Sequence, residues 1–205
     1  MKIGVIDYGA SNIFSVVRAL NSLGASTKIL KKSKDFENID KLVFPGQGSM
    51  GACLKKLSEN DLRDSLIFSL KNLPFLGICL GLQILFSESE ESEDEMGLGI
   101  FPEKIKKFSE FKDRTIKIPH MGWNQVEFSQ SHFIWEGLES SKDFYFVHSY
   151  ASKEIDEKYI YSKTFHGESF NSAVAKDNIF ATQFHPEKSG KSGLNLLQNF
   201  IDWKI

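Results

Sequence analysis

The sequence predicts an α/β fold, with a mainly parallel central sheet covered by helices on both faces and additional antiparallel strands in the second half. In the first half, short apolar runs alternate with helical patterns, as in parallel sheets buried on both faces. The second half instead holds strand-like runs separated by turns, as in hairpins. The length of 205 residues fits a single domain over residues 1–205.

The elements of the first half follow from local patterns. Apolar runs predict four strands, at Lys2–Asp7, Ser26–Lys31, Lys41–Phe44 and Pro74–Ile78. A helix is predicted after the first strand, because Ser11 is a suitable N-cap and Gly24 a suitable end. Its expected apolar stripe comprises Phe14, Val17, Leu20 and Leu23. Two more helices are predicted at Leu62–Leu70 and Leu80–Phe86.

Six short runs in the second half are predicted to be strands. They are Thr115–Ile118, Gln125–Phe128, Phe144–Tyr150, Tyr159–Phe165, Ser172–Ala175 and Ile179–Phe184. The last two flank Lys176-Asp177-Asn178, which has the composition of a hairpin turn. A final helix is predicted at Gly193–Trp203, with Leu194, Leu197 and Ile201 on one face.

The composition excludes several classes of protein. Hydrophobic residues make up 41%, charged residues 25%, and the net charge is -2, so nothing favours a nucleic acid or a membrane surface as the partner. The opening MKIGVID is typical of a buried strand and not of a signal peptide, and no apolar run approaches the ~18 residues of a membrane span. A cytoplasmic location is expected, where the two cysteines would be thiols.

Two segments invite functional interpretations that the sequence does not support. Ser87–Glu95 carries six carboxylates, but it lacks the ligand spacing of a calcium site, so a solvated loop is expected. Gly46–Gly51 matches the GxGxxG pattern of dinucleotide sites. Such a site also needs an acidic residue at the end of the next strand, and that strand ends in Gly77-Ile78-Cys79.

Cys79 is the strongest candidate for a catalytic residue. It follows an apolar strand and precedes a predicted helix, with Gly77 and Gly81 two residues away on either side. This G-x-C-x-G pattern has the form of a nucleophile elbow with Cys in place of Ser. Glycines permit the tight turn that lifts the sulfur out of the sheet. From this pattern alone, a buried structural cysteine is an equal alternative. Cys53 lacks such a setting and is interpreted as a packing residue.

His185 and Glu187 are candidates for the base and its orienting group. His185 follows a predicted strand and precedes Pro186, which favours extended backbone. Residues i and i+2 of an extended chain project the same way, so the carboxylate can orient the imidazole. Alone, His-Pro-Glu is more typical of a surface turn. Together with Cys79 at a neighbouring strand end, it indicates an enzyme with a cysteine nucleophile.

Such an enzyme also needs donors for an oxyanion. The backbone N–H of Leu80, the residue after the nucleophile, is one candidate. The loop Pro45-Gly46-Gln47-Gly48 follows a neighbouring strand and could provide another. His120 and His148 are expected to be hydrogen-bonded structural residues. No Cys/His cluster has zinc spacing, so no metal is expected.

These residues stand in motifs that resemble those of the class I glutamine amidotransferases, whose triad is Cys-His-Glu. The resemblance covers essentially the whole chain and is greatest to the glutaminase subunit of imidazole glycerol phosphate synthase. The motifs are Ile6-Asp-Tyr-Gly9, Pro45-Gly-Gln-Gly48, Gly77-Ile-Cys-Leu-Gly-Leu-Gln83, Pro119-His-Met-Gly-Trp-Asn124, Tyr145-Phe-Val-His-Ser-Tyr150 and Gln183-Phe-His-Pro-Glu-Lys-Ser189.

The resemblance implies a triad of Cys79, His185 and Glu187 that hydrolyses L-glutamine without a metal or an organic cofactor. It implies that Gln83 lies in the substrate pocket. It assigns the oxyanion hole to the loop residues Gln47 and Gly48, which would act with Leu80.

A partner is implied as well: a cyclase subunit with a (β/α)8-barrel fold, which forms a heterodimer with this chain. Ammonia would pass to it through a channel and close the imidazole ring in histidine biosynthesis. Residues expected near that interface are Asn12, Met121, Trp123 and Lys188.

Two positions depart from the family pattern. Gln47 stands where the family usually has Val, and Ser11 where it usually has Gly. An alternative is therefore a paralogous glutaminase subunit that supplies ammonia to enzymes building amidino sugars. Two other classes are a binding-only subunit with a silent triad and a cysteine peptidase on a similar sheet.

Overall fold

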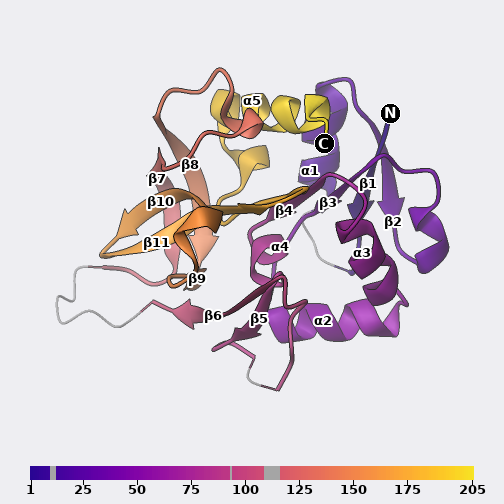
Figure 1. The fold of residues 1–205 in the computed structure, drawn as a ribbon, viewed down its shortest axis with the longest axis horizontal. Helices are drawn as coiled ribbons and strands as arrows, with labels where there is room; N and C mark the ends of the chain where they lie inside the picture. Colours follow the sequence, from indigo (N-terminus) through magenta and orange to yellow (C-terminus); the bar gives the residue numbers. More distant parts are fainter. Residues whose placement is uncertain (10–12, 93, 109–115) are drawn as a thin grey trace.

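The computed structural model describes residues 1–9, 13–92, 94–108 and 116–205 (Figure 1). Strands of these residues form one mixed sheet, whose main path has the order β2-β1-β3-β4-β12-β11-β10-β7-β8. The pairs from β2 to β12 are parallel, and those from β12 to β8 are antiparallel. The predicted fold class is confirmed, including the change from parallel to antiparallel pairing.

The bounds of the elements are as follows. The helices are α1 (Ile13–Ser22), α2 (Met50–Glu59), α3 (Arg63–Leu70), α4 (Leu80–Gln83) and α5 (Gly190–Asp202). The strands are β1 (Lys2–Ile6), β2 (Ser26–Leu30), β3 (Lys41–Phe44), β4 (Phe75–Ile78), β5 (Phe86–Ser89), β6 (Phe101–Lys107), β7 (His120–Phe128), β8 (Ser141–His148), β9 (Tyr150–Ser152), β10 (Ile160–His166), β11 (Glu168–Lys176) and β12 (Ile179–Thr182).

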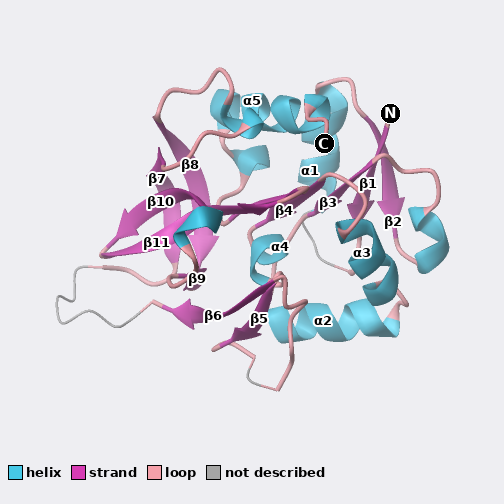
Figure 2. Cartoon of the chain, viewed as in Figure 1, coloured by secondary structure: helices cyan, strands magenta, loops and turns pink. Residues whose placement is uncertain are grey.

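Helices cover both faces of the parallel part of the sheet (Figure 2). On one face, α1 and α5 pack on a core that includes Val5, Val16 and Leu197. On the other face, α2, α3 and α4 pack on a core that includes Phe44 and Leu66. Two buried faces explain why the inner parallel strands β1, β3 and β4 have mainly apolar sequences.

The predicted faces of two helices are corrected by the structure. The buried side of α1 comprises Ile13, Val16, Ala19 and Leu20, and Phe14 is 67% exposed. The N-terminal part of this helix offers two apolar stripes one position apart, so helical spacing alone did not distinguish them. In α5, Leu197 and Ile201 are buried as expected, but Leu194 is 37% exposed.

Strands β7, β8, β10, β11 and β12 confirm five of the six strands predicted in the second half, but other parts of the chain depart from the prediction. Residues 116–118 are not a strand, and Thr115 lies outside the described residues. Strands β5 and β6 were not predicted, and the helix expected over Leu80–Phe86 is only the short α4. The turn after β11 is confirmed, since Lys176 pairs with Ile179 across it.

The site depends on the central pair of parallel strands, β4 and β12. Their register pairs Ile78 with Thr182. The residues that follow these two positions therefore leave the sheet at the same edge. Cys79 follows the first strand directly, and His185 follows the second after two more residues.

Candidate active site

Cys79 sits on a strained turn between β4 and α4, with φ of 53° and ψ of −102°. Positive φ is uncommon for a residue with a side chain and is maintained only by the surrounding structure. Gly77 and Gly81 provide that support through close backbone packing. A Cβ on Gly77 would overlap the Gly81 carbonyl, and a Cβ on Gly81 would overlap the Phe44 carbonyl. The predicted elbow geometry is therefore present, and the packing holds Cys79 at the edge of the sheet.

His185 is positioned by its own backbone. Its N–H donates to the Tyr145 carbonyl at 2.9 Å, and its carbonyl accepts from the Ser189 hydroxyl at 2.6 Å. The Ser189 hydroxyl in turn accepts from the Tyr145 N–H at 2.9 Å. This closed set of bonds ties the segment after β12 to β8. It fixes the backbone from which the His185 ring projects.

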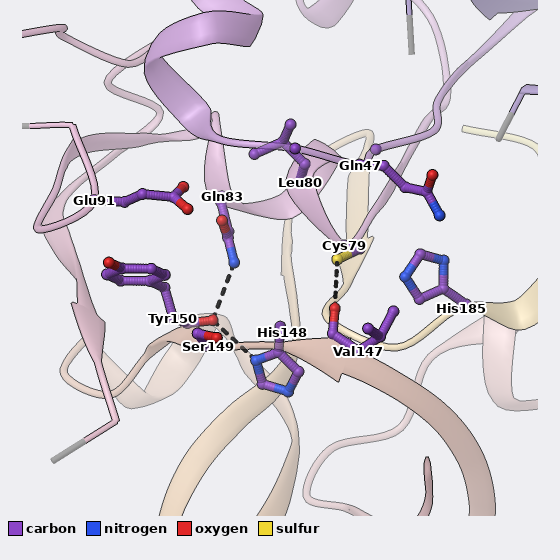
Figure 3. A pocket seen from close by; sticks show the side chains of 12 residues that line it. Gln47, Cys79, Leu80, Gln83, Glu91, Val147, His148, Ser149, Tyr150 and His185 are labelled. Atoms are coloured by element: carbon purple, nitrogen blue, oxygen red, sulfur yellow. Dashed lines mark hydrogen bonds between the residues drawn. The ribbon is translucent and has the colours of Figure 1, made fainter. Parts of the chain in front are cut away.

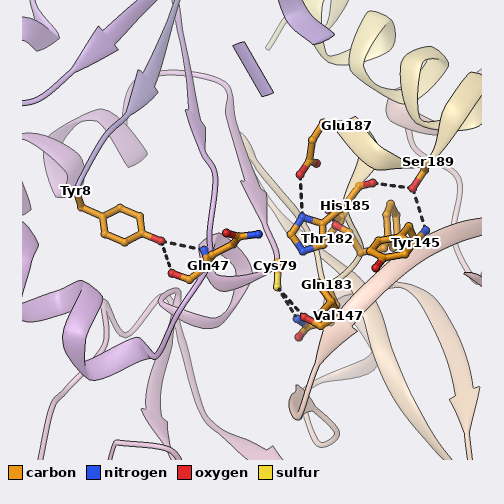
Figure 4. Close-up of polar contacts among 11 residues, drawn as sticks. Tyr8, Gln47, Cys79, Tyr145, Val147, Thr182, Gln183, His185, Glu187 and Ser189 are labelled. Atoms are coloured by element: carbon orange, nitrogen blue, oxygen red, sulfur yellow. Dashed lines mark hydrogen bonds and ion pairs between the residues drawn. The ribbon is translucent and has the colours of Figure 1, made fainter. Parts of the chain in front are cut away.

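Glu187 lies on the 3-10 turn Pro186–Lys188 and faces the His185 ring (Figure 4). The Nδ1 atom of His185 is 2.8 Å from Oε1 of Glu187. The opposite ring nitrogen, Nε2, is therefore the one available to exchange protons with substrate. The three residues Cys79, His185 and Glu187 lie in one site, in the order that a nucleophile, a base and an orienting carboxylate require.

The pKa of His185 is raised well above its usual range. Burial alone would lower this pKa, but the charge of the nearby Cys79 sulfur opposes it, and the hydrogen bond with Glu187 adds to the effect. The site therefore favours a protonated His185 ring beside the Cys79 sulfur. A thiolate is the nucleophilic form of cysteine.

Gln183 begins one of the motifs quoted above, but its role at the site was not predicted. Its side chain is buried, and Nε2 donates to the Cys79 sulfur at 3.6 Å. Its Oε1 accepts from Gln83 Nε2 at 3.3 Å, and Gln83 also donates to the Tyr150 carbonyl at 3.0 Å. Gln83 thus orients a second amide that points at the nucleophile.

A pocket of about 290 Å³ opens beside Cys79 (Figure 3). Cys79 and His185 lie near one end, and Gln83, Tyr150 and Glu91 line the other. Glu91 accepts a hydrogen bond from the Met50 N–H at 3.1 Å, and burial raises the pKa of its carboxyl.

The expectation that Ser87–Glu95 is a solvated loop is therefore wrong in part. Phe86–Ser89 forms β5, and the next turn carries the Glu91 carboxylate into the pocket. Glu93 lies outside the described residues.

The loop after β3 lines the same pocket through Gly46, Gln47 and Gly48. Gly46 packs against the elbow so closely that a Cβ there would overlap Leu80. The N–H of Gln47 donates to the Tyr8 hydroxyl at 3.0 Å. Of the residues expected at the oxyanion hole, Leu80 and Gly48 lie in the pocket wall, while the Gln47 N–H is directed to Tyr8.

Three of the four expected interface residues are described and lie near one another. Met121 and Trp123 on β7 are 63% and 59% exposed. Trp123 contacts Tyr145 edge to face at 6.3 Å, and the Lys188 ammonium lies 5.8 Å from the same Tyr145 ring. Asn12 lies outside the described residues.

This exposed face is close to the nucleophile. Met121 pairs with Val147 across β7 and β8, and the Val147 carbonyl oxygen is 3.9 Å from the Cys79 sulfur. Strand β8 therefore has Cys79 next to Val147 and the exposed Met121 on the neighbouring strand.

His120 and His148 are hydrogen-bonded, as expected, and His148 also lines the pocket beside Cys79. Both are buried, and His120 Nδ1 is 3.0 Å from His148 Nε2. Cys53 is also buried among apolar residues, as its sequence setting indicated. Within the described part of the chain, no group of His, Cys, Asp and Glu has the arrangement of a metal site. Nor is any described helix long and apolar enough to cross a membrane.

Comparisons with known proteins agree on one family. The model of the family "Glutamine amidotransferase class-I" matches residues 4–203. The "Imidazole glycerol phosphate synthase subunit HisH" of Nitrosomonas europaea is 45% identical over 209 residues, covering 98% of this chain and 98% of that protein. The subunit of the same name from Hydrogenovibrio crunogenus is 42% identical over 202 residues, covering 97% of this chain and 95% of that protein.

The fold is shared with solved structures as well. One, described as "Crystal structure of glutamine amidotransferase", has a TM-score of 0.75 at 20% identity and covers 98% of this chain and 97% of that one. At this identity the likeness concerns the fold alone.

Proposed function

The chain belongs to the class I glutamine amidotransferases, among the subunits named imidazole glycerol phosphate synthase subunit HisH, and we propose that it hydrolyses glutamine with Cys79, His185 and Glu187. It is a glutaminase subunit whose ammonia serves the synthesis of imidazole glycerol phosphate in histidine biosynthesis. The names of the relatives favour this pathway over the amidino-sugar alternative. The observation that carries the residue assignment is the meeting of a strained Cys79 and a buried His185–Glu187 pair in one pocket.

The Cys79 thiolate attacks the side-chain carboxamide carbon of glutamine. The tetrahedral intermediate collapses when imidazolium Nε2 of His185 gives its proton to the departing nitrogen, so that ammonia leaves and a glutamyl thioester remains. Neutral His185 then takes a proton from water, whose oxygen attacks the thioester. Glutamate is released, and the thiolate and imidazolium are restored. Glu187 keeps Nε2 directed at the reacting atoms and stabilises the charged ring.

The oxyanion of both tetrahedral intermediates needs N–H donors. Leu80 begins α4, and the first N–H groups of a helix have no partner within it. We assign the second donor to the loop residues Gln47 and Gly48, although the Gln47 N–H donates to the Tyr8 hydroxyl in this structure. Removing one such donor typically costs about 3–4 kcal/mol of barrier.

The shape of the pocket suits free glutamine. With its carboxamide at Cys79, the substrate extends toward Gln83, Tyr150 and Glu91. The Glu91 carboxylate at that end attracts the α-ammonium group of a free amino acid. A glutamine inside a peptide has no α-ammonium group to offer it. This selection of a free amino acid separates the activity from that of a cysteine peptidase.

The ammonia passes to a cyclase subunit with a (β/α)8-barrel fold, which docks on the face around Met121, Trp123 and Lys188. Exposed Trp and Met side chains are typical of binding surfaces. The short distance from the Cys79 sulfur to β8 supports transfer at this face.

The test of the assignment is chemical labelling with a chloroketone analogue of glutamine, followed by mass spectrometry of the peptides. One adduct is expected, on Cys79, and an excess of glutamine should prevent it. The buried Cys53 is the internal control, since burial raises the pKa of its thiol and keeps it unreactive. Labelling of Cys53 instead, or no protection by glutamine, contradicts the proposal. The absence of any specific adduct would instead indicate a binding-only subunit.

A further inference from the structure

Tyr8 is a buried tyrosine at the carboxyl end of β1 that the mechanism does not use. Its ring stacks on Phe44 at the end of β3, with centroids 5.3 Å apart and planes at 20°. The side chain is 3% exposed. Because β1 and β3 are parallel neighbours, this stacking carries the Tyr8 hydroxyl to the loop that follows β3.

The Tyr8 hydroxyl holds both peptide groups of Gln47. It accepts a hydrogen bond from the Gln47 N–H at 3.0 Å and donates one to the Gln47 carbonyl at 3.0 Å (Figure 4). Burial, together with the nearby Cys53 thiol, raises the pKa of Tyr8, so the hydroxyl stays protonated and can play both parts. One hydroxyl thus fixes the orientation of two consecutive peptides.

This arrangement has a direct consequence for the oxyanion hole. Figure 4 shows Tyr8 and Cys79 on opposite sides of Gln47. An N–H group that donates to Tyr8 cannot donate at the same time to an oxyanion at Cys79. In a trans peptide the carbonyl points opposite to the N–H, so the Gly46 carbonyl is directed away from Tyr8. A carbonyl that faces the developing oxyanion would repel it.

We propose that Tyr8 is a positioning residue that latches the loop Gly46–Gly48 in a resting arrangement and so limits hydrolysis by the isolated chain. The inference rests on the proposed glutaminase function and names the group that regulates the same site. Release of the Gln47 N–H from Tyr8 lets the peptide turn over and supply the missing donor. A liganded partner accelerates hydrolysis by favouring that second arrangement.

The loop has the freedom that such a change requires. Gly48 has φ of 94°, and a Cβ placed on it would meet nothing within 4 Å. Gln47 has no branch at Cβ to stiffen the backbone, unlike the Val that the family pattern usually has here. Gly46, by contrast, is packed on Leu80, which anchors the loop at the elbow while the next peptide turns.

The direct test is Tyr8→Phe, which keeps the ring on Phe44 and removes only the hydroxyl. Glutaminase activity is measured for the chain alone, with its cyclase partner, and with the partner and its substrate. Since one net hydrogen bond corresponds to roughly a tenfold change in an equilibrium, the rate of the chain alone should rise roughly tenfold. The rise should appear in kcat and not in KM, and the fully stimulated rate should change by less than about twofold.

The matched control is Tyr161→Phe, which removes a tyrosine hydroxyl on β10 and should leave all three rates unchanged. A structural defect in Tyr8→Phe would lower the basal and stimulated rates together, and that result overturns the latch. An unchanged basal rate overturns it as well. If the triad assignment itself were wrong, the chloroketone analogue of glutamine would label Cys79 neither in Tyr8→Phe nor in the wild type.

Hydrogen exchange of the wild-type chain gives a second test that does not depend on the variant. The Gln47 amide should be protected in the isolated chain and lose protection when the liganded partner is added. A Gln47 amide that exchanges freely in the isolated chain would contradict the latch.

Discussion

The Nδ1 atom of His185 lies 2.8 Å from Oε1 of Glu187, and the two side chains are only 1% and 0% exposed. A charged hydrogen bond in such surroundings is stronger than one in water. It fixes the orientation of the His185 ring and stabilises its protonated form, the state that delivers a proton to the leaving ammonia.

Glu187→Gln keeps the shape of the side chain but removes its charge. Since a hydrogen bond to a charged group contributes about 1.5–3 kcal/mol, kcat for glutamine hydrolysis should fall about 10- to 100-fold with little change in KM. Steady-state kinetics of the complex provide the measurement. Glu139→Gln, which alters an exposed ion pair with Lys142, should have no effect. A change confined to KM would instead make Glu187 a substrate-binding residue.

The charge state of His185 should depend on Cys79. The Cys79 sulfur is the largest influence that raises the pKa of this ring, and burial opposes it. In the wild type the ring should therefore stay protonated through neutral pH. In Cys79→Ala, NMR of the labelled ring should show a clearly lower pKa. The same pKa in both proteins would mean that no thiolate–imidazolium pair forms.

The buried histidines His120 and His148 should make the fold sensitive to mild acid. Burial lowers the pKa of His120 to about 4 and that of His148 to about 3. Above a pH of about 6.5 these rings are neutral in the folded and the unfolded chain, so their environment costs no stability. As the pH falls below this value, only the unfolded chain takes up protons, and the free energy of unfolding decreases.

By pH of about 5, each ring should have removed on the order of 1–2 kcal/mol from the free energy of unfolding. Carboxylates contribute little in this range because most of them titrate lower. Urea unfolding above a pH of about 6.5 and at a pH of about 5 measures the difference in the free energy of unfolding. His120→Asn removes one of the rings, so the free energy of unfolding should depend less on pH than in the wild type. The same pH dependence in both proteins would mean that burial of His120 does not cause it.

How far the sequence could predict this site depends on the range of each interaction. The Cys79 elbow and the His185–Glu187 pair are local patterns, and the carboxyl ends of β4 and β12 bring them together as expected. Gln183 and Glu91 act through contacts with residues distant in the sequence: Gln183 with Cys79, and Glu91 with Met50. No spacing rule encodes such contacts, so Gln183 was given no role although it begins a quoted motif, and Glu91 was assigned to solvent.

The positions of the strands and helices could likewise be predicted only where the local sequence pattern is strong. Parallel strands buried on both faces carry a strong apolar signal, and their predicted positions agree with β1 to β4 within one or two residues. Strand β6 alternates polar and apolar residues only weakly, with Lys104, Lys106 and Lys107 among seven residues, and it was missed. Phe14 was placed in the core of α1, although it faces outward.

The exposed face of β7 should carry much of the binding to the partner. Trp123→Ala removes an indole that is 59% exposed, and a central aromatic residue of this kind typically contributes about 2 kcal/mol or more. The Kd for the cyclase should therefore rise about 30-fold. Phe68→Ala, which removes a ring 70% exposed on α3, is the matched control and should leave the Kd unchanged. Equal effects of the two substitutions would place the interface elsewhere.

Cys79→Ala in the complex with the cyclase tests the central assignment most directly. Its turnover is measured once with glutamine and once with an ammonium salt as the nitrogen source, and Cys53→Ala serves as the matched variant. The account predicts that Cys79→Ala loses glutamine-dependent turnover and keeps the ammonium-dependent reaction, while Cys53→Ala retains both. Glutamine-dependent turnover near the wild-type rate in Cys79→Ala would contradict it.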